Sequence, residues 1–209
     1  MKKQLQAMLD MQDATNSKIH PRWIEQDYAW YRAVWIECGE LMDHYGYKWW
    51  KQQHCDEEQV RLEVVDIWHF GMSALFKAGV SSEAIADELL AALETYRSTD
   101  IGVREATEAL AGFAITHKGF SVRHFWALME ASGMSFDDLY TAYIGKNVLN
   151  FFRQDHGYKD GSYIKQWAGR EDNEHLVELV SSLDCRSDTF RDDLYHALQR
   201  RYDSAAVNI

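Results

Sequence analysis

Four carboxylates occur as two closely spaced pairs in this chain of 209 residues. Glu37 and Glu40 are three residues apart, and so are Glu63 and Asp66. Residues three apart share one face of a helix, so each pair would hold two negative charges side by side. No Lys or Arg lies one helical turn away from any of the four. A hard divalent cation such as Mg²⁺, which prefers oxygen ligands, would supply the missing positive charge.

The segment that carries the second pair is apolar nearly all round, with Val64, Val65, Ile67, Trp68 and Phe70. A helix of that composition is a buried one. The alternative is that the carboxylates are simply solvated. That alternative fits the neighbouring run 56–58, where Glu57 can pair with Arg61 on a wet face. Since buried charges need partners, we expect Glu63 and Asp66 to be buried and to bind metal.

The composition is that of a soluble globular protein, at 46% hydrophobic and 26% charged residues. No apolar run approaches the length of a membrane span, and the first residues lack a signal-peptide core. Three cysteines without metal-type spacing predict neither a disulfide framework nor a zinc site. The formal net charge of -11 argues against a nucleic-acid-binding surface. We therefore expect a cytoplasmic protein, with residues 1–209 forming a single domain that binds neither membrane nor nucleic acid.

Hydrophobic periodicity, capping residues and glycine stops predict helices along the whole chain, separated by short loops. The predicted helices span residues 5–16, 26–45, 56–77, 83–96, 104–116, 121–131, 135–153, 174–183 and 188–201. No segment shows the period-2 alternation of a strand, and 157–164 reads as a loop. The expected fold class is an all-α helical bundle.

A basic stretch near the C-terminal end contains residues that could complete the site formed by the acidic pairs. Its donor side chains are Lys146, Asn150, Arg153, Tyr158, Lys159 and Lys165. The first three are spaced i, i+4 and i+7 and so lie on one helical stripe. Arg offers a fork for phosphate oxygens and Lys a compact charge. The alternative is a solvated basic face paired with Asp155 and Asp160. The acidic pairs elsewhere in the chain favour phosphoryl chemistry, because metal plus Lys or Arg is how such sites are built.

Three further features carry weaker signals. Lys48-Trp49-Trp50-Lys51 connects the two acidic helices. Its tryptophans either pack or line a base pocket, and its lysines could reach a phosphate. His69 is either a core histidine or a contact to a sugar hydroxyl. Gln12 and Asn16, at i and i+4, suit a pyrimidine edge, although a polar helix surface explains them equally well.

Five blocks in order along the chain resemble the all-α dimeric dUTPases, which are related to the MazG-type nucleotide pyrophosphohydrolases. The blocks are residues 9–16, 36–43, 48–51, 62–70 and 146–173. The two acidic pairs alone mark only the broad superfamily, whereas the long C-terminal block is specific. Residues 80–133 match no motif. Gly39 stands between the first acidic pair where the family pattern would have Ala.

The resemblance implies hydrolysis of dUTP, and of dUDP, to dUMP with release of pyrophosphate or phosphate by a homodimer. Two or more Mg²⁺ ions per active site would be bound by Glu37, Glu40, Glu63 and Asp66. Glu37 or Glu40 would deprotonate the attacking water. The phosphates would be covered by Lys146, Arg153, Tyr158, Lys159 and Lys165, with Lys48, Trp49 and Lys51 also near the substrate. Gln12, Asn16 and Asn150 would read the uracil edge or hold the nucleoside in place, while His69 and Phe70 would discriminate against a 2′-hydroxyl by contact with the sugar.

The resemblance also implies a rigid metal-binding core with a smaller mobile lobe, which we assign to 80–133. The nearest alternative is a related pyrophosphohydrolase that acts on dCTP or on a broad NTP/dNTP range. A di-iron carboxylate bundle would need paired Glu-x-x-His motifs, and only Asp66-x-x-His69 approximates one. A non-enzymatic helical module would instead use the tryptophans as interface anchors.

Overall fold

The computed structural model describes residues 1–206, which are all-α as expected apart from one two-stranded hairpin. The chain divides into two compact units, Met1–Leu139 and Tyr140–Ile209. The elements of the first unit are α1 (Lys2–Ile19), the 3-10 helix η1 (Trp23–Gln26), α2 (Trp30–Tyr45), α3 (Glu57–Leu75), α4 (Ser82–Thr95), α5 (Val103–His117) and α6 (Val122–Ala131). Helix α7 (Phe136–Asp155) begins in the first unit and ends in the second. The second unit continues with β1 (Gln166–Trp167), β2 (Arg170–Glu171), α8 (Asp172–Ser182) and α9 (Phe190–Ala206).

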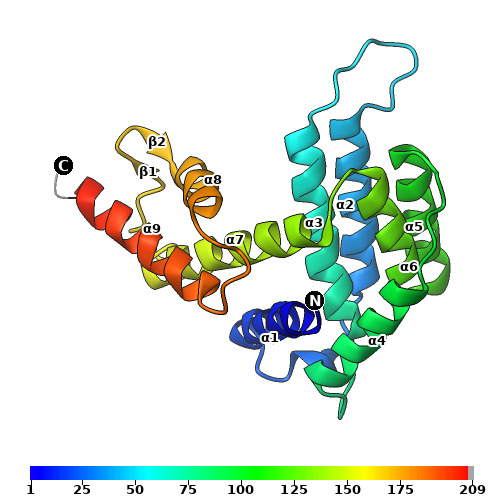
Figure 1. Ribbon diagram of the computed structural model, residues 1–209, viewed down its shortest axis with the longest axis horizontal. Coiled ribbons are helices and arrows are strands. Elements are labelled where there is room, and N and C mark those ends of the chain that lie inside the picture. Colours follow the sequence, from blue (N-terminus) through cyan, green and yellow to red (C-terminus); the bar gives the residue numbers. More distant parts are fainter. Residues whose placement is uncertain (207–209) are drawn as a thin grey trace. The chain divides into compact units, whose positions relative to one another are not determined.

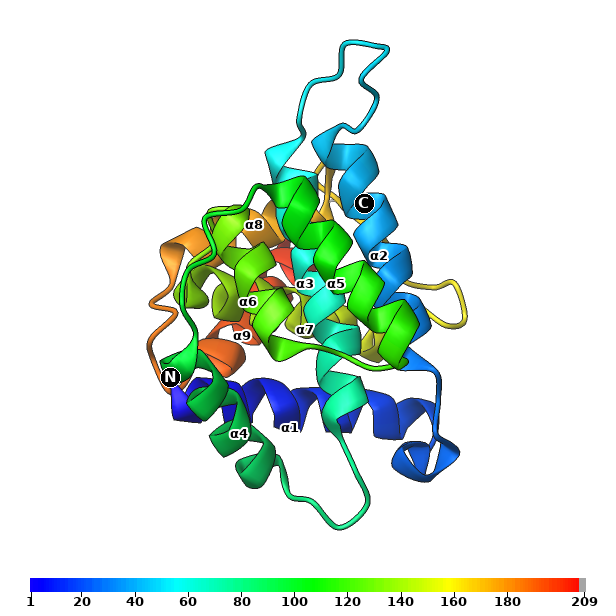
Figure 2. The same ribbon diagram turned by 90° about the vertical axis from the view of Figure 1, so that its right-hand side faces the viewer.

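The first unit is built around α2 and α3, which run antiparallel side by side and are joined by a loop that extends beyond their ends (Figure 1). Helix α5 packs on α2, and α6 packs on α3 and α5. Helix α1 lies across the far end of α3, next to α4 (Figure 2). This arrangement turns the acidic faces of α2 and α3 toward a common region.

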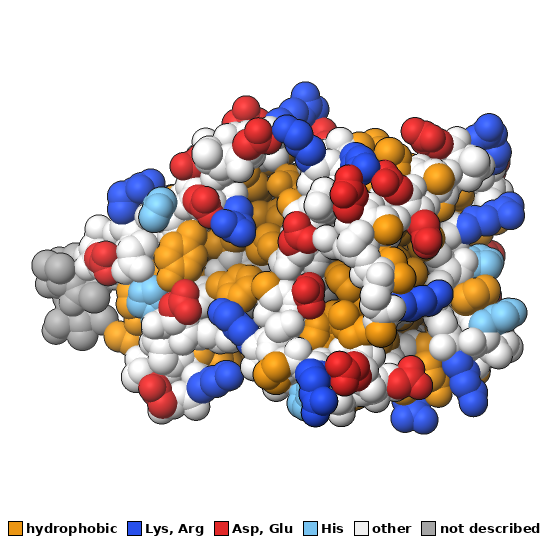
Figure 3. Space-filling view, turned by 90° about the horizontal axis from the view of Figure 1, so that it is seen from below, with side chains coloured by type: hydrophobic (Ala, Val, Ile, Leu, Met, Phe, Trp, Pro, Cys, Tyr) orange, Lys and Arg blue, Asp and Glu red, His pale blue; other side chains and the backbone are white. Residues whose placement is uncertain are grey.

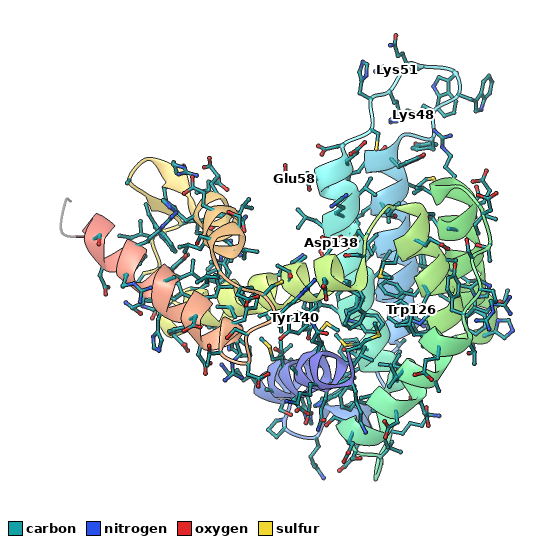
Figure 4. The ribbon with its side chains drawn as sticks, in the orientation of Figure 1. Lys48, Lys51, Glu58, Trp126, Asp138 and Tyr140 are labelled. Atoms are coloured by element: carbon teal, nitrogen blue, oxygen red, sulfur yellow. The ribbon has the colours of Figure 1, made fainter. Side chains whose placement is uncertain are left out.

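Aromatic side chains fill the interior between α3 and α6. The Trp68 ring stacks on Phe125 with centroids 4.8 Å apart, and the Trp126 ring lies 5.3 Å from that of Trp68. Trp126 can be followed in the interior of the unit in Figure 4. Phe120 lies against the backbone of α3 at Gly71, where a Cβ atom would overlap its ring. Burying such rings removes a large apolar area from water and holds α3 in place.

Capping residues begin several helices where the sequence predicts. The Ser81 hydroxyl accepts a hydrogen bond from Ala84 N at 3.2 Å at the start of α4. At the start of α7, Ser135 and Asp138 form a reciprocal capping box, with bonds of 3.1 and 2.9 Å. Helix α2 starts at Trp30 rather than near 26, because Asp27 has a left-handed backbone that ends η1. The other helix boundaries differ from the predicted ones by a few residues at most, except at the end of α9.

The hairpin of β1 and β2 was not predicted. Its two-residue strands pair Gln166 with Glu171 and Trp167 with Arg170, so they are too short to show alternation. The turn residues Ala168 and Gly169 both have positive φ, 49° and 79°, as a type I′ turn requires. Because Ala is an unusual residue in such a turn, the sequence lacks the usual hairpin signal.

The sequence predicts that residues 80–133 form a smaller lobe, but the structure places them in the larger unit. There α4 packs on α1, and α5 packs on α2. The smaller unit begins at Tyr140. Among the described residues, no helix is both long and apolar enough to cross a membrane.

Candidate functional site

Three of the four predicted carboxylates come together between α2 and α3. Glu37 of α2 and Glu63 and Asp66 of α3 each offer an oxygen, and these oxygens all lie within 4.8 Å of one another. Glu63 is the most buried of the three, with 7% of its surface exposed. Glu37 and Asp66 are partly buried. Three carboxylates at this spacing form a set of hard oxygen donors that fits Mg²⁺.

Glu40 is placed differently from the other three. It lies one turn after Glu37 on α2, but it is exposed and does not belong to the group whose oxygens converge. Its charge nevertheless contributes to raising the pKa of Glu37. The exposed residues Asp56, Glu57 and Glu58 at the start of α3 agree with the solvated role expected for them (Figure 4 labels Glu58).

Negative charge is crowded within this cluster. Burial raises the pKa of Glu37 to about 7, helped by a hydrogen bond with Glu63 and by the charges of Asp66, Glu40 and Glu63. His44 Nε2 lies 3.7 Å from Glu63 Oε1, which is beyond hydrogen-bond distance but close enough for attraction when the imidazole is protonated. Sequence reasoning noticed His44 only as the residue one turn after Glu40, because its contact crosses from α2 to α3.

The raised pKa of Glu37 predicts a pH dependence of stability. The folded-state pKa of about 7 is above the ordinary value of 4.5, so protonated Glu37 favours folding below pH 4.5, and this contribution is lost as the pH rises through 7. After allowance for partial exposure, the loss is on the order of 1–2 kcal/mol. Thermal denaturation of the metal-free protein at pH 5 and pH 8 measures it. Glu37→Gln should show a smaller decrease between the two pH values, and an equal decrease in both proteins would contradict the assignment.

A buried polar network joins α1 to α3 in the same unit. Gln12 Nε2 and Asn16 Nδ2 each donate to Ser73 Oγ at 3.0 Å, and Gln12 Nε2 also lies 3.3 Å from Asn16 Oδ1. His69 Nδ1 is 3.0 Å from Gln12 Oε1. Gln12, Asn16 and Ser73 are at most 4% exposed. The structure therefore brings together three of the residues predicted to contact the nucleoside.

Ser73 is the member of this network that sequence reasoning missed. Its only signal was its position, one turn after His69 on α3, and a serine in a helix is common. Phe70, also predicted to contact the sugar, is partly buried and its ring stacks on Trp30 with centroids 6.3 Å apart.

The segment Lys48–Lys51 lies in the loop that extends beyond α2 and α3 (Figure 4). Trp49 is 90% exposed and Trp50 is 58% exposed, so neither is a core residue in this chain. Lys48 Nζ is 3.4 Å from Asp43, and the loop is tied back by the bond from Lys48 N to Gln53 Oε1 at 2.6 Å. Packing of these tryptophans in the core is therefore excluded, whereas packing at an interface and a place in a base pocket both stay predictions.

In the second unit, Arg153 is engaged by a buried carboxylate. Arg153 Nε and Nη2 donate to the two oxygens of Asp172 at 2.8 and 2.9 Å, and Tyr163 donates to Asp172 at 2.8 Å. Asp172 is fully buried. Asp155 and Asp160, which the sequence offered as partners of the basic residues, accept hydrogen bonds from other side chains. Asp155 accepts from Tyr195, and Asp160 accepts from Ser162. The Nε and Nη2 groups of Arg153 are therefore bonded to Asp172.

The predicted phosphate contacts other than Lys48 and Lys51 lie in the second unit, as does Asn150, which is predicted to contact the nucleoside. Tyr158, Lys159 and Lys165 are exposed, whereas Lys146 and Asn150 are partly buried. Lys165 Nζ lies 3.4 Å from Glu171. The Tyr158 ring lies under the Arg153 guanidinium at 6.0 Å.

On the face shown in Figure 3, acidic and basic side chains are interspersed, and no extended basic patch of the kind that binds nucleic acid is visible there.

Comparison with protein-family models finds a match over residues 4–158 to a family described as dUTPase. The matched segment contains Gln12, Asn16, both acidic pairs and the basic residues up to Tyr158. No match is found among curated proteins.

Proposed function

Since the chain belongs to the dUTPase family and is a dUTP diphosphatase, we propose that its reaction depends on Mg²⁺ and converts dUTP to dUMP and pyrophosphate, and dUDP to dUMP and phosphate. The observation that supports the metal dependence most directly is the convergence of Glu37, Glu63 and Asp66 within 4.8 Å. Two or more Mg²⁺ ions, when bound, would neutralise phosphate charge and lower the pKa of a coordinated water.

The acidic residues would share two tasks. Glu63 and Asp66 would hold metal from α3, and Glu37 from α2, because hard oxygen donors are what Mg²⁺ requires. We assign removal of the proton from the attacking water to Glu37 or Glu40, which lie on one face of α2. Glu40 would also complete the metal-binding set, as its charge already acts on Glu37.

The remaining polar residues would bind the nucleotide. Gln12 and Asn16, with Asn150, would read the uracil edge, while His69 and Phe70 would contact the sugar. The phosphates would be held by the cations and the tyrosine hydroxyl that the sequence identifies, namely Lys48, Lys51, Lys146, Arg153, Tyr158, Lys159 and Lys165. Trp49 would line the base pocket. The ion pair with Asp172 supports this role for Arg153, because it restricts the orientation of the guanidinium.

We further propose that the enzyme is a homodimer and acts in the cytoplasm. Large apolar side chains are exposed on the first unit, among them Ile36 at 43%, Trp49 at 90% and Leu62 at 38%. Such residues are typical of surfaces that bind another protein, and a second copy is the simplest candidate. Analytical ultracentrifugation measures the oligomeric state. The three free cysteines, Cys38, Cys55 and Cys185, suit a reducing compartment.

A substrate panel tests the proposal. Product release is measured from dUTP, dUDP, dCTP, dTTP and UTP, each with Mg²⁺ and with EDTA. We expect turnover of dUTP and dUDP in Mg²⁺ and none in EDTA. Comparable turnover of dCTP or of all five nucleotides would favour a related pyrophosphohydrolase with another base preference. Undiminished turnover in EDTA would contradict the role of the carboxylates.

A further inference from the structure

The buried network of Gln12, Asn16, Ser73 and His69 has a direction that follows from one contact. Ser73 Oγ lies 3.0 Å from the carbonyl oxygen of His69. A carbonyl oxygen can only accept, so the hydroxyl proton of Ser73 points to it. The Ser73 oxygen must then accept from its other two neighbours, and both amides must turn their NH₂ groups toward it.

The orientation of the amides also determines the tautomer of His69. With Gln12 Nε2 directed at Ser73 and at Asn16 Oδ1, Gln12 Oε1 faces His69 Nδ1 at 3.0 Å. An amide oxygen is an acceptor, so Nδ1 must carry the proton. Such tautomers and amide orientations are inferred from the hydrogen-bond network, and here every member is linked to the His69 carbonyl through Ser73.

Without the serine hydroxyl, a second orientation keeps the contacts among Gln12, Asn16 and His69. If both amides rotate by half a turn, Asn16 donates to Gln12 instead of accepting, and Gln12 donates to the other tautomer of His69. Each contact among the three residues is then preserved with its direction reversed. Ser73 makes the two arrangements unequal, since in the reversed one two amide oxygens would face the lone pairs of its oxygen.

We propose that Ser73 is a positioning residue that sets the base specificity of the enzyme by locking the orientation of Gln12 and Asn16 and the tautomer of His69. This inference rests on the proposed role of the two amides in reading the base. Uracil presents an N3–H donor and an O4 acceptor, whereas cytosine presents an N3 acceptor and an N4 donor. Reversing the amides exchanges donors for acceptors, so the reversed network suits cytosine where the native network suits uracil.

The test compares Ser73→Ala with wild type in kcat/KM for dUTP and for dCTP. We expect the dUTP preference to fall at least about tenfold, because each hydrogen bond that Ser73 accepts favours one orientation. Ser132→Ala is the matched control, since within the described residues Ser132 has a buried hydroxyl without a hydrogen-bond partner. Ser73→Thr keeps the hydroxyl and should restore the preference. A merely structural role would lower kcat/KM for both nucleotides and leave their ratio unchanged, which would overturn the proposal.

A second measurement does not depend on the folding of the Ser73 variants. Nitrogen chemical shifts of His69 in the wild-type protein, assigned through connectivity to its own backbone resonances, distinguish the two neutral tautomers. We expect the proton on Nδ1, and a proton on Nε2 would overturn the inference. If the wild type shows no preference for dUTP over dCTP, the failure lies in the proposed reading of the base, whereas an unchanged preference in Ser73→Ala rejects the role of Ser73 alone.

Discussion

Glu63→Gln is expected to lower kcat for dUTP by a factor on the order of 10³, with the fold intact, since removing a single charged or polar group from such a site typically costs this much. Glu63 is the most buried of the three convergent carboxylates, and Gln preserves its shape while removing its charge. The loss should be accompanied by weaker Mg²⁺ activation. Steady-state rates measured across a Mg²⁺ titration give both quantities.

Glu63→Gln should lower activity without lowering the stability of the protein. In the metal-free protein it removes one of the charges that raise the pKa of Glu37, so the melting temperature should stay equal or rise. Glu58→Gln is the matched control, because Glu58 is on the same helix but exposed, and it should leave both quantities unchanged (Figure 4). Full activity of Glu63→Gln would show that the carboxylate cluster is not the catalytic centre.

Asp172→Asn is expected to destabilise the second unit by roughly 3–5 kcal/mol, because breaking a buried ion pair leaves the opposite charge without compensation. Asp172 is fully buried and accepts from both Arg153 and Tyr163. Urea denaturation followed by tryptophan fluorescence measures the change. Asp192→Asn is the control, since Asp192 pairs with Arg191 on the surface with both side chains 60% exposed, and such pairs contribute at most about 1 kcal/mol.

The pKa of Asp172 gives a further signature of this pair. Burial would raise this pKa, but hydrogen bonds from Arg153 and Tyr163 outweigh burial and hold it below the ordinary 3.8. A lowered folded-state pKa stabilises the protein above the unfolded value and is lost as the pH falls through the folded one. Asp172→Asn should therefore lose part of the acid sensitivity of the wild type below about pH 4. An equal acid transition in both proteins would contradict this assignment.

The helices could be predicted well because their signals are local. Ser81 and Ser135 are adjacent in sequence to the helices they cap, and the apolar faces repeat at helical spacing. The start of α2 could not be predicted, because nothing in the sequence indicates that Asp27 adopts a left-handed backbone. The hairpin turn could not be predicted for the same reason, because nothing in the sequence indicates that Ala168 adopts a left-handed backbone.

The candidate site was predictable to the extent that its residues share a helix face. The spacing of Glu63 and Asp66 on α3 is enough to place them together, whereas the separation of Glu40 from the other three depends on how α2 packs against α3. Ser73 was missed because its amide partners Asn16 and Gln12 are 57 and 61 residues away in sequence. Asp172 was missed because its partner Arg153 is 19 residues away. Contacts across such separations are a property of packing that periodicity does not encode.

The close contact between Gly71 and the Phe120 ring limits which substitutions these two positions can accept during evolution. Any larger residue at 71 would overlap the Phe120 ring, and overpacking a core is costly. A smaller residue at 120 alone would leave a cavity beside Trp68, which is costly too. Each single step is therefore penalised, although the double change could be tolerated. Lineages that diverge from this protein should keep both residues or exchange them together, so that two positions 49 residues apart would evolve as one.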